Sequence, residues 1–356
     1  MRNKWQPKKR LSCLGNPFDM AKEKILPLFI PHLGCPHVCV FCDQHAIAGK
    51  EFDFEQIRRD LEIFFADQQN IGAQIAFFGG SFTAIDKDLM RRFLSLGYGY
   101  VQAGKASGIR ISTRPDVVNN ETLDCLKAYG VKTIELGIQS MSEEVLMKSG
   151  RGHNPWQSLD AMQRIREKGF VLGGQMMVGL PASTPEREKE TALAICQGGA
   201  KECRIYPTVV LRNTALAAMN RRGEYTPLTV EEAVWRCVPL RELFAQHHVT
   251  VLRMGLCENE ELRRNDAMVA GPYHPAFGEL VEQACMKQKI EAFLLGKETR
   301  GKRLEIIVSP RSVSRITGHG GLKKNLLTRY ELTDMTLQTD GNMTDGRGVK
   351  IVLKDH

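Results

Sequence analysis

The chain has 356 residues, of which 42% are hydrophobic and 25% are charged, and its formal net charge at pH 7 is +8. These fractions are typical of a soluble globular protein, and no apolar run approaches the ~20 residues that a membrane-spanning helix requires. The sequence therefore predicts no membrane association. Its length favours one large α/β barrel with a smaller additional unit.

The cysteines and the N-terminal segment indicate the compartment. Three of the ten cysteines fall within positions 35–42 and the others are scattered, a usage typical of a reducing compartment. The basic segment MRNKWQPKKR at positions 1–10 is not followed by the apolar run that a secretion signal contains. We therefore expect a cytoplasmic protein.

Basic residues are concentrated in two segments. Five of the first ten residues are basic and none is acidic, and positions 287–329 contain eleven basic residues against Glu291, Glu298 and Glu305. Such segments favour an anionic partner such as RNA, because neutralisation of phosphates dominates nucleic-acid affinity. A solvated basic surface without a partner explains the same pattern equally well.

Six apolar runs along the chain are typical of buried strands. They are ILPLFIP (25–31), QIAFFGG (74–80), GIRIST (108–113), VKTIELGIQS (131–140), FVLGGQMMVGL (170–180) and CRIYPTVVL (203–211). Helical patterns separate these runs, with start signals at Asn154-Pro155, at Thr184-Pro185 and at Thr229 with Glu232. Six strand–helix units predict an α/β fold, a partial (β/α)6 TIM-like barrel.

The sequence changes character after the helix that starts at Thr229. A short apolar run, VTVLRMGL (249–256), ends the barrel pattern, and a turn-rich stretch that becomes helical follows at 271–281. Short strands are then expected at RLEIIVS (303–309), TRYELTDMTLQTD (328–340) and GVKIVL (348–353). We therefore expect three parts: a basic N-terminal extension (1–24), the barrel (25–255) and a C-terminal extension with short strands (256–356).

The stretch GCPHVCVFCDQ (34–44) contains Cys35, Cys39 and Cys42 directly after the first predicted strand. In a parallel barrel this loop lies at the carboxyl edge of the strands, where such folds have their active sites. Three thiolates can hold an iron–sulfur cube whose fourth iron stays open to another ligand. A structural zinc site is the alternative, and it would take its fourth ligand from Cys13, His32, His37 or His45.

The spacing Cys35-x3-Cys39-x-Phe41-Cys42 resembles the signature of the radical S-adenosylmethionine (radical SAM) superfamily, in which the open iron chelates S-adenosylmethionine. The resemblance continues through FFGGSFT (77–83), ISTRPD (111–116), ELGIQS (135–140), SGRGHN (149–154), MMVGLP (176–181) and RIYPTVVLRNTAL (204–216). Together these stretches, over roughly residues 25–280, resemble the radical SAM domain of the Elongator catalytic subunit. This resemblance implies a 4Fe–4S cluster, S-adenosylmethionine, an electron donor such as ferredoxin or flavodoxin, and transfer RNA as one candidate partner.

The resemblance also implies contacts between the chain and the adenosine and methionine parts of the cofactor. In the family, the backbone of Phe41 meets the adenine, and the absence of side chains at Gly79 and Gly80 lets the backbone approach the amino acid end. An ordinary loop contact and a tight turn are the alternative roles of these residues.

Three polar side chains complete the implied cofactor site. Gln139 can donate and accept hydrogen bonds to a ribose or carboxylate, Arg151 offers a guanidinium fork for the methionine carboxylate, and Gln175 occupies a position that often faces the adenosine. A structural hydrogen bond is the alternative for each of them.

The chain departs from its relatives at several positions. Ser81 follows the double glycine where many relatives have glutamate, and Ser112 replaces the glutamate that is usual in Elongator-like sequences. Asp43 follows the last cysteine where porphyrin-acting relatives have another cysteine, which disfavours porphyrin chemistry. About 75 residues after Leu280 are too few for the acetyltransferase domain of Elongator.

The sequence thus predicts a radical SAM enzyme that generates a 5′-deoxyadenosyl radical and abstracts hydrogen from a substrate, with RNA as a candidate. No catalytic side chain is assigned. The alternatives are an inactive iron–sulfur protein that binds RNA and a structural protein held together by zinc.

Overall fold

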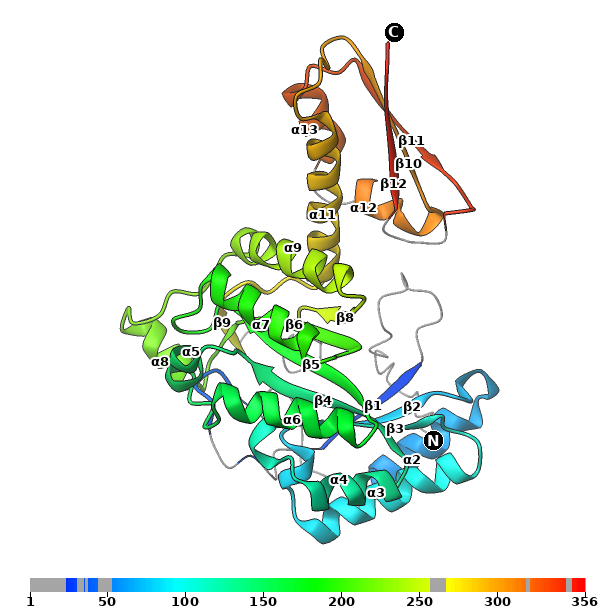
Figure 1. Cartoon of the computed structure of the whole chain (residues 1–356), viewed down its shortest axis with the longest axis vertical. Helices are drawn as coiled ribbons and strands as arrows, with labels where there is room; N and C mark the ends of the chain where they lie inside the picture. The colour runs from blue at the N-terminus through cyan, green and yellow to red at the C-terminus, as the bar shows by residue number, and fades with distance from the viewer. Residues whose placement is uncertain are drawn as a thin grey trace, which may run out of the picture.

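The computed structural model describes residues 24–30, 35, 38–43, 53–256, 267–317, 321–343 and 348–355. Its main sheet has seven strands in the order β1-β2-β3-β4-β5-β6-β8, and all of them are parallel (Figure 1). The strands are β1 (Ile25–Phe29), β2 (Gln74–Phe78), β3 (Gly108–Thr113), β4 (Val131–Gln139), β5 (Val171–Val178), β6 (Glu202–Pro207) and β8 (Thr250–Met254).

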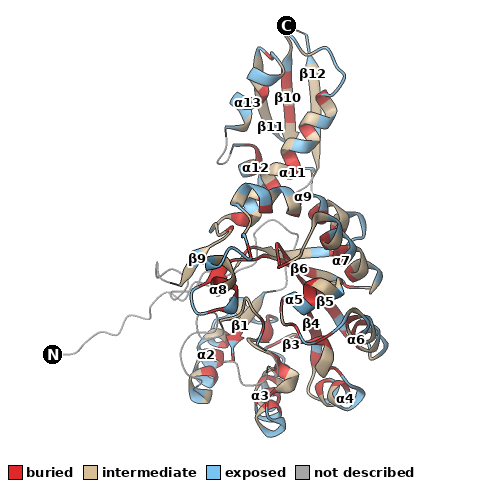
Figure 2. Ribbon diagram, turned by 90° about the vertical axis from the view of Figure 1, so that its left-hand side faces the viewer, coloured by how far each residue is buried: buried red, intermediate tan, exposed pale blue. Residues whose placement is uncertain are grey.

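Helices follow the strands and cover one face of the sheet (Figures 1 and 2). This arrangement confirms the predicted partial TIM-like barrel, and the apolar run at 249–256 supplies a seventh strand, β8. The helices of this part are α2 (Phe54–Ala66), α3 (Lys87–Gln102), α4 (Asn120–Ala128), α5 (Glu143–Lys148), α6 (Pro155–Glu167), α7 (Pro185–Gln197), α8 (Ala215–Arg221) and α9 (Val230–Gln246).

The predicted helix starts are confirmed at α6, α7 and α9. Asn154 and Thr229 each form a capping box with the residue three positions later, and the Thr184 side chain accepts a hydrogen bond from the backbone of Arg187. These caps satisfy backbone N–H groups that would otherwise lack partners, so each helix begins at a defined residue.

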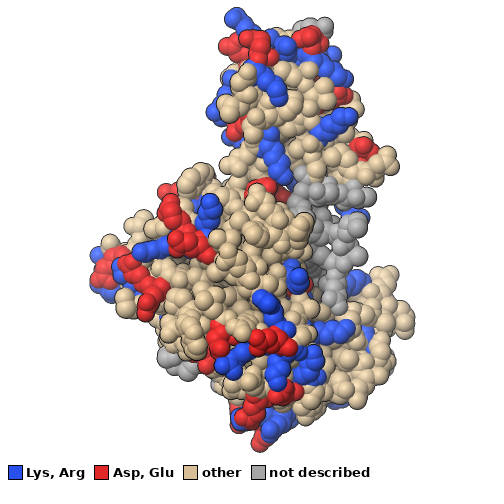
Figure 3. Space-filling view, viewed as in Figure 1, with Lys and Arg blue, Asp and Glu red and all other residues tan. Residues whose placement is uncertain are grey.

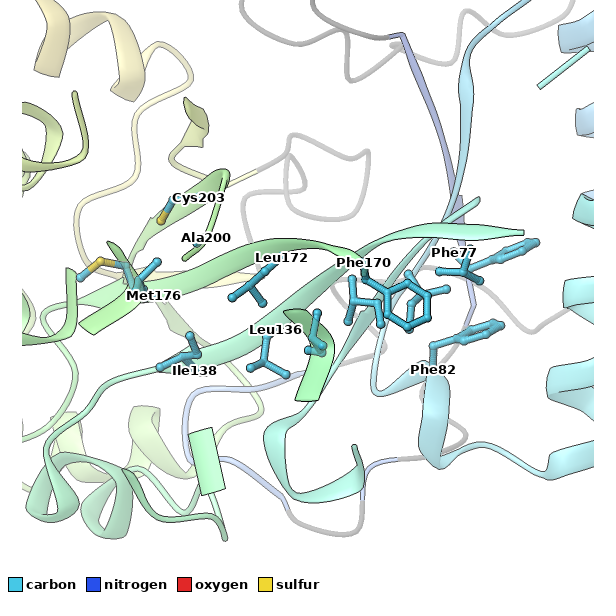
Figure 4. Close-up of a cluster of buried hydrophobic side chains, with 14 of the residues drawn as sticks. Phe77, Phe82, Leu136, Ile138, Phe170, Leu172, Met176, Ala200 and Cys203 are labelled. Atoms are coloured by element: carbon cyan, nitrogen blue, oxygen red, sulfur yellow. The ribbon is translucent and has the colours of Figure 1, made fainter. Parts of the chain in front are cut away.

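The main core lies between the sheet and its helices. Figure 4 shows Phe77, Leu136, Leu172 and Met176 on neighbouring strands, and all four are at most 1% exposed. The ring of Phe82 stacks on that of Phe77, with the ring centres 5.4 Å apart. Because side chains alternate along a strand, the residues between these apolar positions point to the opposite, concave face of the sheet.

The concave face carries a buried network of charges. Arg110 on β3 donates to Glu135 on β4 at 2.9 Å, to Glu202 on β6 at 2.6 Å and to Gln74 on β2 at 2.8 Å. Arg204 on β6 binds Glu135 through two bonds of 2.6 and 3.0 Å. The positive charges of two arginines thus neutralise the negative charges of two glutamates, which offsets the free-energy cost of burying all four side chains.

The prediction of one strand over 203–211 was wrong. The backbone N–H and the hydroxyl of Thr208 both donate to the carbonyl of Val178, the last residue of β5, so the chain turns there and leaves the main sheet. It continues as β7 (Val210–Leu211), which pairs in the antiparallel sense with β9 (Met268–Ala270).

The C-terminal part has its own sheet in the order β11-β10-β12, in which β10 is parallel to β11 and antiparallel to β12. Its elements are α11 (Phe277–Leu294), β10 (Arg303–Val308), α12 (Ser314–Thr317), α13 (Leu322–Arg329), β11 (Asp334–Thr339) and β12 (Val349–Lys354). Three strands near the predicted positions are present. The unit also contains helices that were not predicted there; in α13, Leu322 and Leu326 lie four positions apart and pack one helix face on this second core.

Helix α11 belongs to both cores (Figure 1). Its first half contributes Val281 and Cys285 to the barrel core, and its second half contributes Ile290 and Leu294 to the C-terminal core.

The predicted boundary at residue 255 stays a prediction, and most of the predicted extension 1–24 lies outside the described residues. Among the helices that the structure describes, none is long and apolar enough to cross a membrane.

Candidate active site

Cys35, Cys39 and Cys42 follow β1 at the carboxyl edge of the main sheet. Cys39 is buried, the other two are half-buried, and all three are free thiols. The Cys42 N–H donates to the carbonyl of Cys39 at 3.0 Å, which closes a turn between these two residues. No three His, Cys, Asp or Glu side chains converge as a ready metal site in the described ranges. The alternative zinc ligands Cys13, His32, His37 and His45 lie outside those ranges.

Two neighbouring segments hold the cysteine turn in place. The Val40 N–H donates to the Ser149 carbonyl at 3.0 Å, and the Leu216 N–H donates to the Val40 carbonyl at 2.7 Å. Gly150 has φ +64°, and a Cβ there would lie 3.2 Å from the Val38 carbonyl oxygen, so a glycine is needed at this contact. The loop after α5 and the start of α8 therefore position the turn.

The side chain of Phe41 packs with Val40 against Leu216, Ala217 and Tyr225. This contact fixes the side chain, and the predicted contact between its backbone and adenine stays a prediction.

Two arginines approach Cys39, Arg114 directly after β3 and Arg151 in the loop after α5. Nη1 of Arg151 lies 3.3 Å from Cys39 Sγ and Nη1 of Arg114 lies 3.9 Å from the same sulfur. Nη2 of Arg151 donates to the Gly137 carbonyl at 2.5 Å, and Nη2 of Arg114 donates to the Arg151 carbonyl. Burial raises the pKa of the Cys35 thiol, and the positive charges of Arg114 and Arg151 oppose that shift. Two guanidinium groups thus lie beside the cysteine turn, and their positive charge partly offsets the burial that disfavours a Cys35 thiolate.

Gln139 ends β4 in a strained conformation. Its φ is +63°, the pairing of β4 with β5 shifts register between Gly137 and Gln139, and its buried Oε1 has no hydrogen-bond partner. A Cβ at Gly137 would lie 3.2 Å from Gln139 Nε2 and 3.3 Å from Arg151 Nη2. Gly137 therefore lets the Gln139 and Arg151 side chains lie beside the same strand end. Left-handed backbone at a non-glycine residue is costly and often marks a functional position.

Gly79 and Gly80 lie at the end of β2 with φ values of +103° and +53°. A Cβ at Gly79 would lie 2.2 Å from the Ile30 carbonyl oxygen, which no side chain could tolerate. The two glycines therefore let the end of β2 lie against the residue that follows β1. Whether they also approach a cofactor stays a prediction.

Buried polar atoms without partners gather along positions 139–158. Within the described ranges they include Gln139 Oε1, Arg151 Nε, and the hydroxyls of Ser149 and Ser158. Leaving such atoms unpaired costs roughly 1–3 kcal/mol each. Burial and the nearby Arg151 charge lower the pKa of His153 to about 3, so its imidazole is neutral. These atoms can bind a polar group, as a site for the amino acid part of S-adenosylmethionine requires.

Gln175 lies opposite Gly137 on β5, within the charged network of the concave face. Its Nε2 donates to Glu135 Oε2 at 2.8 Å and contacts Ser112 Oγ at 3.4 Å. Its predicted contact with adenosine stays a prediction, and the structural hydrogen bond proposed as its alternative is present.

The site also contains residues that were not singled out from the sequence. Arg114, Asp116 and His153 lie within the stretches ISTRPD and SGRGHN, but none was assigned a role there. Arg114 and Asp116 immediately follow β3, and opposite charges two residues apart at the carboxyl edge of a buried strand were a usable signal.

Two family models match consecutive parts of the chain. The model of the radical SAM superfamily matches residues 29–195, and that of the radical SAM C-terminal domain matches residues 200–287. The second match ends within α11, so β10, β11, β12 and the helices between them lie beyond both models.

Individual relatives agree with these matches. An uncharacterized protein of Methanocaldococcus jannaschii is 29% identical over 226 residues, which are 58% of this chain and 68% of that protein. The tRNA uridine(34) acetyltransferase of Methanocaldococcus infernus is 32% identical over 127 residues, 35% of this chain and only 24% of that enzyme. The solved structure of Elp3 from M. infernus superposes with a TM-score of 0.61 at 20% identity and covers 75% of this chain and 63% of that one, which supports the fold.

The matched models, the sheet and the position of the three cysteines agree. The chain resembles the radical SAM part of the Elongator catalytic subunit over the barrel and continues beyond the matched models with β10, β11 and β12. It belongs to the radical SAM superfamily, whose enzymes use a 4Fe–4S cluster and S-adenosylmethionine as cofactors.

Proposed function

We propose that Cys35, Cys39 and Cys42 bind the 4Fe–4S cluster and that S-adenosylmethionine binds next to them at the carboxyl edge of the main sheet. The observation that carries this proposal is the convergence of two arginine side chains on Cys39, beside a row of buried polar atoms that lack partners. Three thiolates fit a cluster with one open iron, and the unpaired polar atoms fit the charged amino acid end of the cofactor.

Each side chain has a proposed role in holding the cofactor. Arg151 binds the carboxylate, because its Nε is unpaired while Nη2 is anchored on Gly137. Gln139 binds a ribose or amino acid group through its free Oε1. Gly79 and Gly80 offer backbone groups to the amino acid end, the Phe41 backbone offers groups to the adenine, and Gln175 faces the adenosine.

When bound together, the cluster and S-adenosylmethionine supply a 5′-deoxyadenosyl radical that abstracts hydrogen from a substrate. The chain orients the cofactor and excludes water from it, since Cys39, Arg114 and Arg151 are each at most 6% exposed. We also propose that a ferredoxin or flavodoxin supplies the electron and that the protein acts in the cytoplasm, which its eight free described cysteines support.

Transfer RNA is the proposed substrate class. Support comes from the relatives, of which one is named a tRNA uridine(34) acetyltransferase, although this chain spans only 24% of it. The basic segment 287–329 gives less support than its composition indicated. Seven of its eleven basic residues pair with carboxylates, namely Lys289, Arg300, Lys302, Arg303, Arg315, Lys323 and Arg329. Figure 3 accordingly shows acidic groups among the basic ones on the C-terminal unit.

The cofactor proposal is tested by reductive cleavage of S-adenosylmethionine. Protein reconstituted anaerobically with iron and sulfide is expected to form 5′-deoxyadenosine when dithionite and S-adenosylmethionine are supplied, and heat-inactivated protein is the control. An intact cluster without any 5′-deoxyadenosine would favour the alternative of an inactive iron–sulfur protein. Filter binding of bulk transfer RNA at low and moderate salt tests the substrate class, and no binding at low salt would eliminate it.

A further inference from the structure

Arg114 has no assigned contact with S-adenosylmethionine, yet its side chain is fixed beside the cysteine turn. It follows β3 and is 2% exposed. Asp116 holds the guanidinium with two bonds, from Nε to Oδ1 at 3.0 Å and from Nη2 to Oδ2 at 3.2 Å. The backbone N–H of Arg114 donates to Ser81 Oγ at 3.3 Å. A guanidinium held in this way has one orientation, so its charge stays at one place.

That place is next to the thiols. Nη1 of Arg114 lies 3.9 Å from Cys39 Sγ, and Nη2 donates to the carbonyl of Arg151, whose own Nη1 lies 3.3 Å from the same sulfur. Asp116 binds Nε and Nη2 of the same guanidinium and so holds a negative charge on its other side. Arg114 and Asp116 therefore change the electrostatic potential at the thiols in opposite directions.

We infer that Arg114 and Asp116 are a charge pair that sets the reduction potential of the 4Fe–4S cluster bound by this chain. The inference rests on the proposed cluster ligands Cys35, Cys39 and Cys42. One-electron reduction adds one negative charge at the cysteine turn, so a fixed cation stabilises the reduced form and a fixed anion destabilises it. Charge and hydrogen bonds to sulfur are established means by which proteins adjust such potentials.

The geometry also predicts how the two residues combine. Arg114 donates toward the sulfur, so removing it deletes both a charge and a possible hydrogen bond. Asp116 touches only the far side of the guanidinium, through Nε and Nη2, so removing its charge leaves the group next to Cys39 in place. Replacing both residues by neutral amides restores the original net charge.

The test is a potentiometric titration of reconstituted full-length protein with dithionite as the one-electron reductant, monitored by electron paramagnetic resonance. At a fixed potential, Arg114→Gln should lower the ratio of reduced to oxidised cluster about tenfold, a shift of about 59 mV to more negative potential. Asp116→Asn should shift it in the opposite direction, and the double variant should lie between Arg114→Gln and the wild type, because the contact of Arg114 with the sulfur is not restored. Arg91→Gln, the same change at an exposed arginine on helix α3, is the matched control and should leave the potential unchanged.

Iron and sulfide are counted in every sample before titration. If Arg114→Gln, Asp116→Asn and the wild type all hold a full complement of cluster and have the same potential, the inference is overturned and the proposed ligands stand. If Arg114→Gln does not hold a cluster, the potentials of Asp116→Asn and Arg114→Lys are measured instead. An unchanged potential in Asp116→Asn would overturn the inference. A wild-type protein that assembles no cluster would instead overturn the proposed ligands, and this inference with them.

Discussion

Nη1 of Arg151 lies 3.3 Å from Sγ of Cys39, although 112 positions separate the two residues in the chain. The contact forms because β1 and β4 are parallel strands of one sheet, so the loop after β1 and the segment after β4 meet at the same edge. A direct backbone hydrogen bond from Val40 to Ser149 also joins the two segments next to this contact. The site is therefore a product of the sheet topology, and Arg151 is its first residue to test.

Arg151→Ala is expected to weaken binding of S-adenosylmethionine by about 2 kcal/mol, roughly 30-fold, which is the scale of a lost charge-assisted hydrogen bond. Arg151→Lys should restore little, because it lacks the planar fork. Anaerobic titration calorimetry on cluster-loaded protein measures the affinity, and Arg164→Ala on the outer helix α6 is a matched control. Unchanged affinity in Arg151→Ala would remove this residue from the proposed site.

Gln139 offers a test that separates stability from binding. Because its φ is +63°, Gln139→Gly should stabilise the fold by about 1 kcal/mol relative to Gln139→Ala, which keeps the strained backbone. Both variants should bind S-adenosylmethionine more weakly than the wild type, since both lose the free Oε1.

Urea unfolding and calorimetry measure these two effects. A glycine variant that binds the cofactor as well as the wild type would show that the strain at Gln139 serves packing rather than binding.

Much of the fold could be predicted from the sequence because its signals are local. The apolar runs marked the strands, and the capping boxes at Asn154 and Thr229 marked where α6 and α9 begin. The continuation of the sixth strand to residue 211 was wrong because its end depends on a hydrogen bond from Thr208 to Val178, thirty positions away.

The site was harder to predict because it depends on convergence between distant segments. The spacing of the cysteines is a local pattern, and it pointed to this edge of the sheet. Arg114 reaches Cys39 only after β1 and β3 are placed in one sheet, and the network around Glu135 joins the five strands from β2 to β6. No pattern within one strand indicates that Gln74, Arg110, Glu135 and Arg204 share a face with their charges paired.

Glu135 should make stability depend on pH in the acid range. Burial alone would raise the pKa of its carboxyl, but the Arg204 and Arg110 guanidiniums outweigh burial and lower the pKa to about 2 from 4.5. Because the folded pKa is the lower one, this stabilisation is present above about pH 4.5 and is lost as the pH falls toward 2. This lowering of the pKa corresponds to about 3 kcal/mol in the free energy of unfolding.

Glu135→Gln should remove this dependence and destabilise the fold by about 3–5 kcal/mol, because two buried arginines lose a charged partner. Urea unfolding from pH 3 to pH 7 measures both effects. Equal pH profiles of the variant and the wild type would contradict the assignment of the acid dependence to Glu135.

The C-terminal unit provides a matched pair of lysines for the RNA proposal. Lys323 is paired with Asp334 at 3.1 Å, whereas the neighbouring Lys324 is exposed and has no carboxylate partner among the described residues. If RNA binds here, Lys324→Gln should weaken binding of bulk transfer RNA more than Lys323→Gln, and the double reversal to Glu should weaken it most.

Filter binding across a salt series measures the affinities, and each lost phosphate contact should reduce the slope of log affinity against log salt by about 1. Cleavage of S-adenosylmethionine without RNA should be unchanged in all three variants. Binding that is indifferent to the double reversal would place the RNA elsewhere on the protein.

The most direct test of the central claim is to count iron and sulfide after anaerobic reconstitution of the wild type and of three single variants, Cys35→Ala, Cys39→Ala and Cys42→Ala. A cluster held by these three thiolates predicts about four iron and four sulfide per chain in the wild type and loss of the cluster in every variant. Cys203→Ala, which changes a buried thiol of the main core, should keep the full complement. Tightly bound zinc with no uptake of iron, or an intact cluster in any of the three variants, would contradict the account.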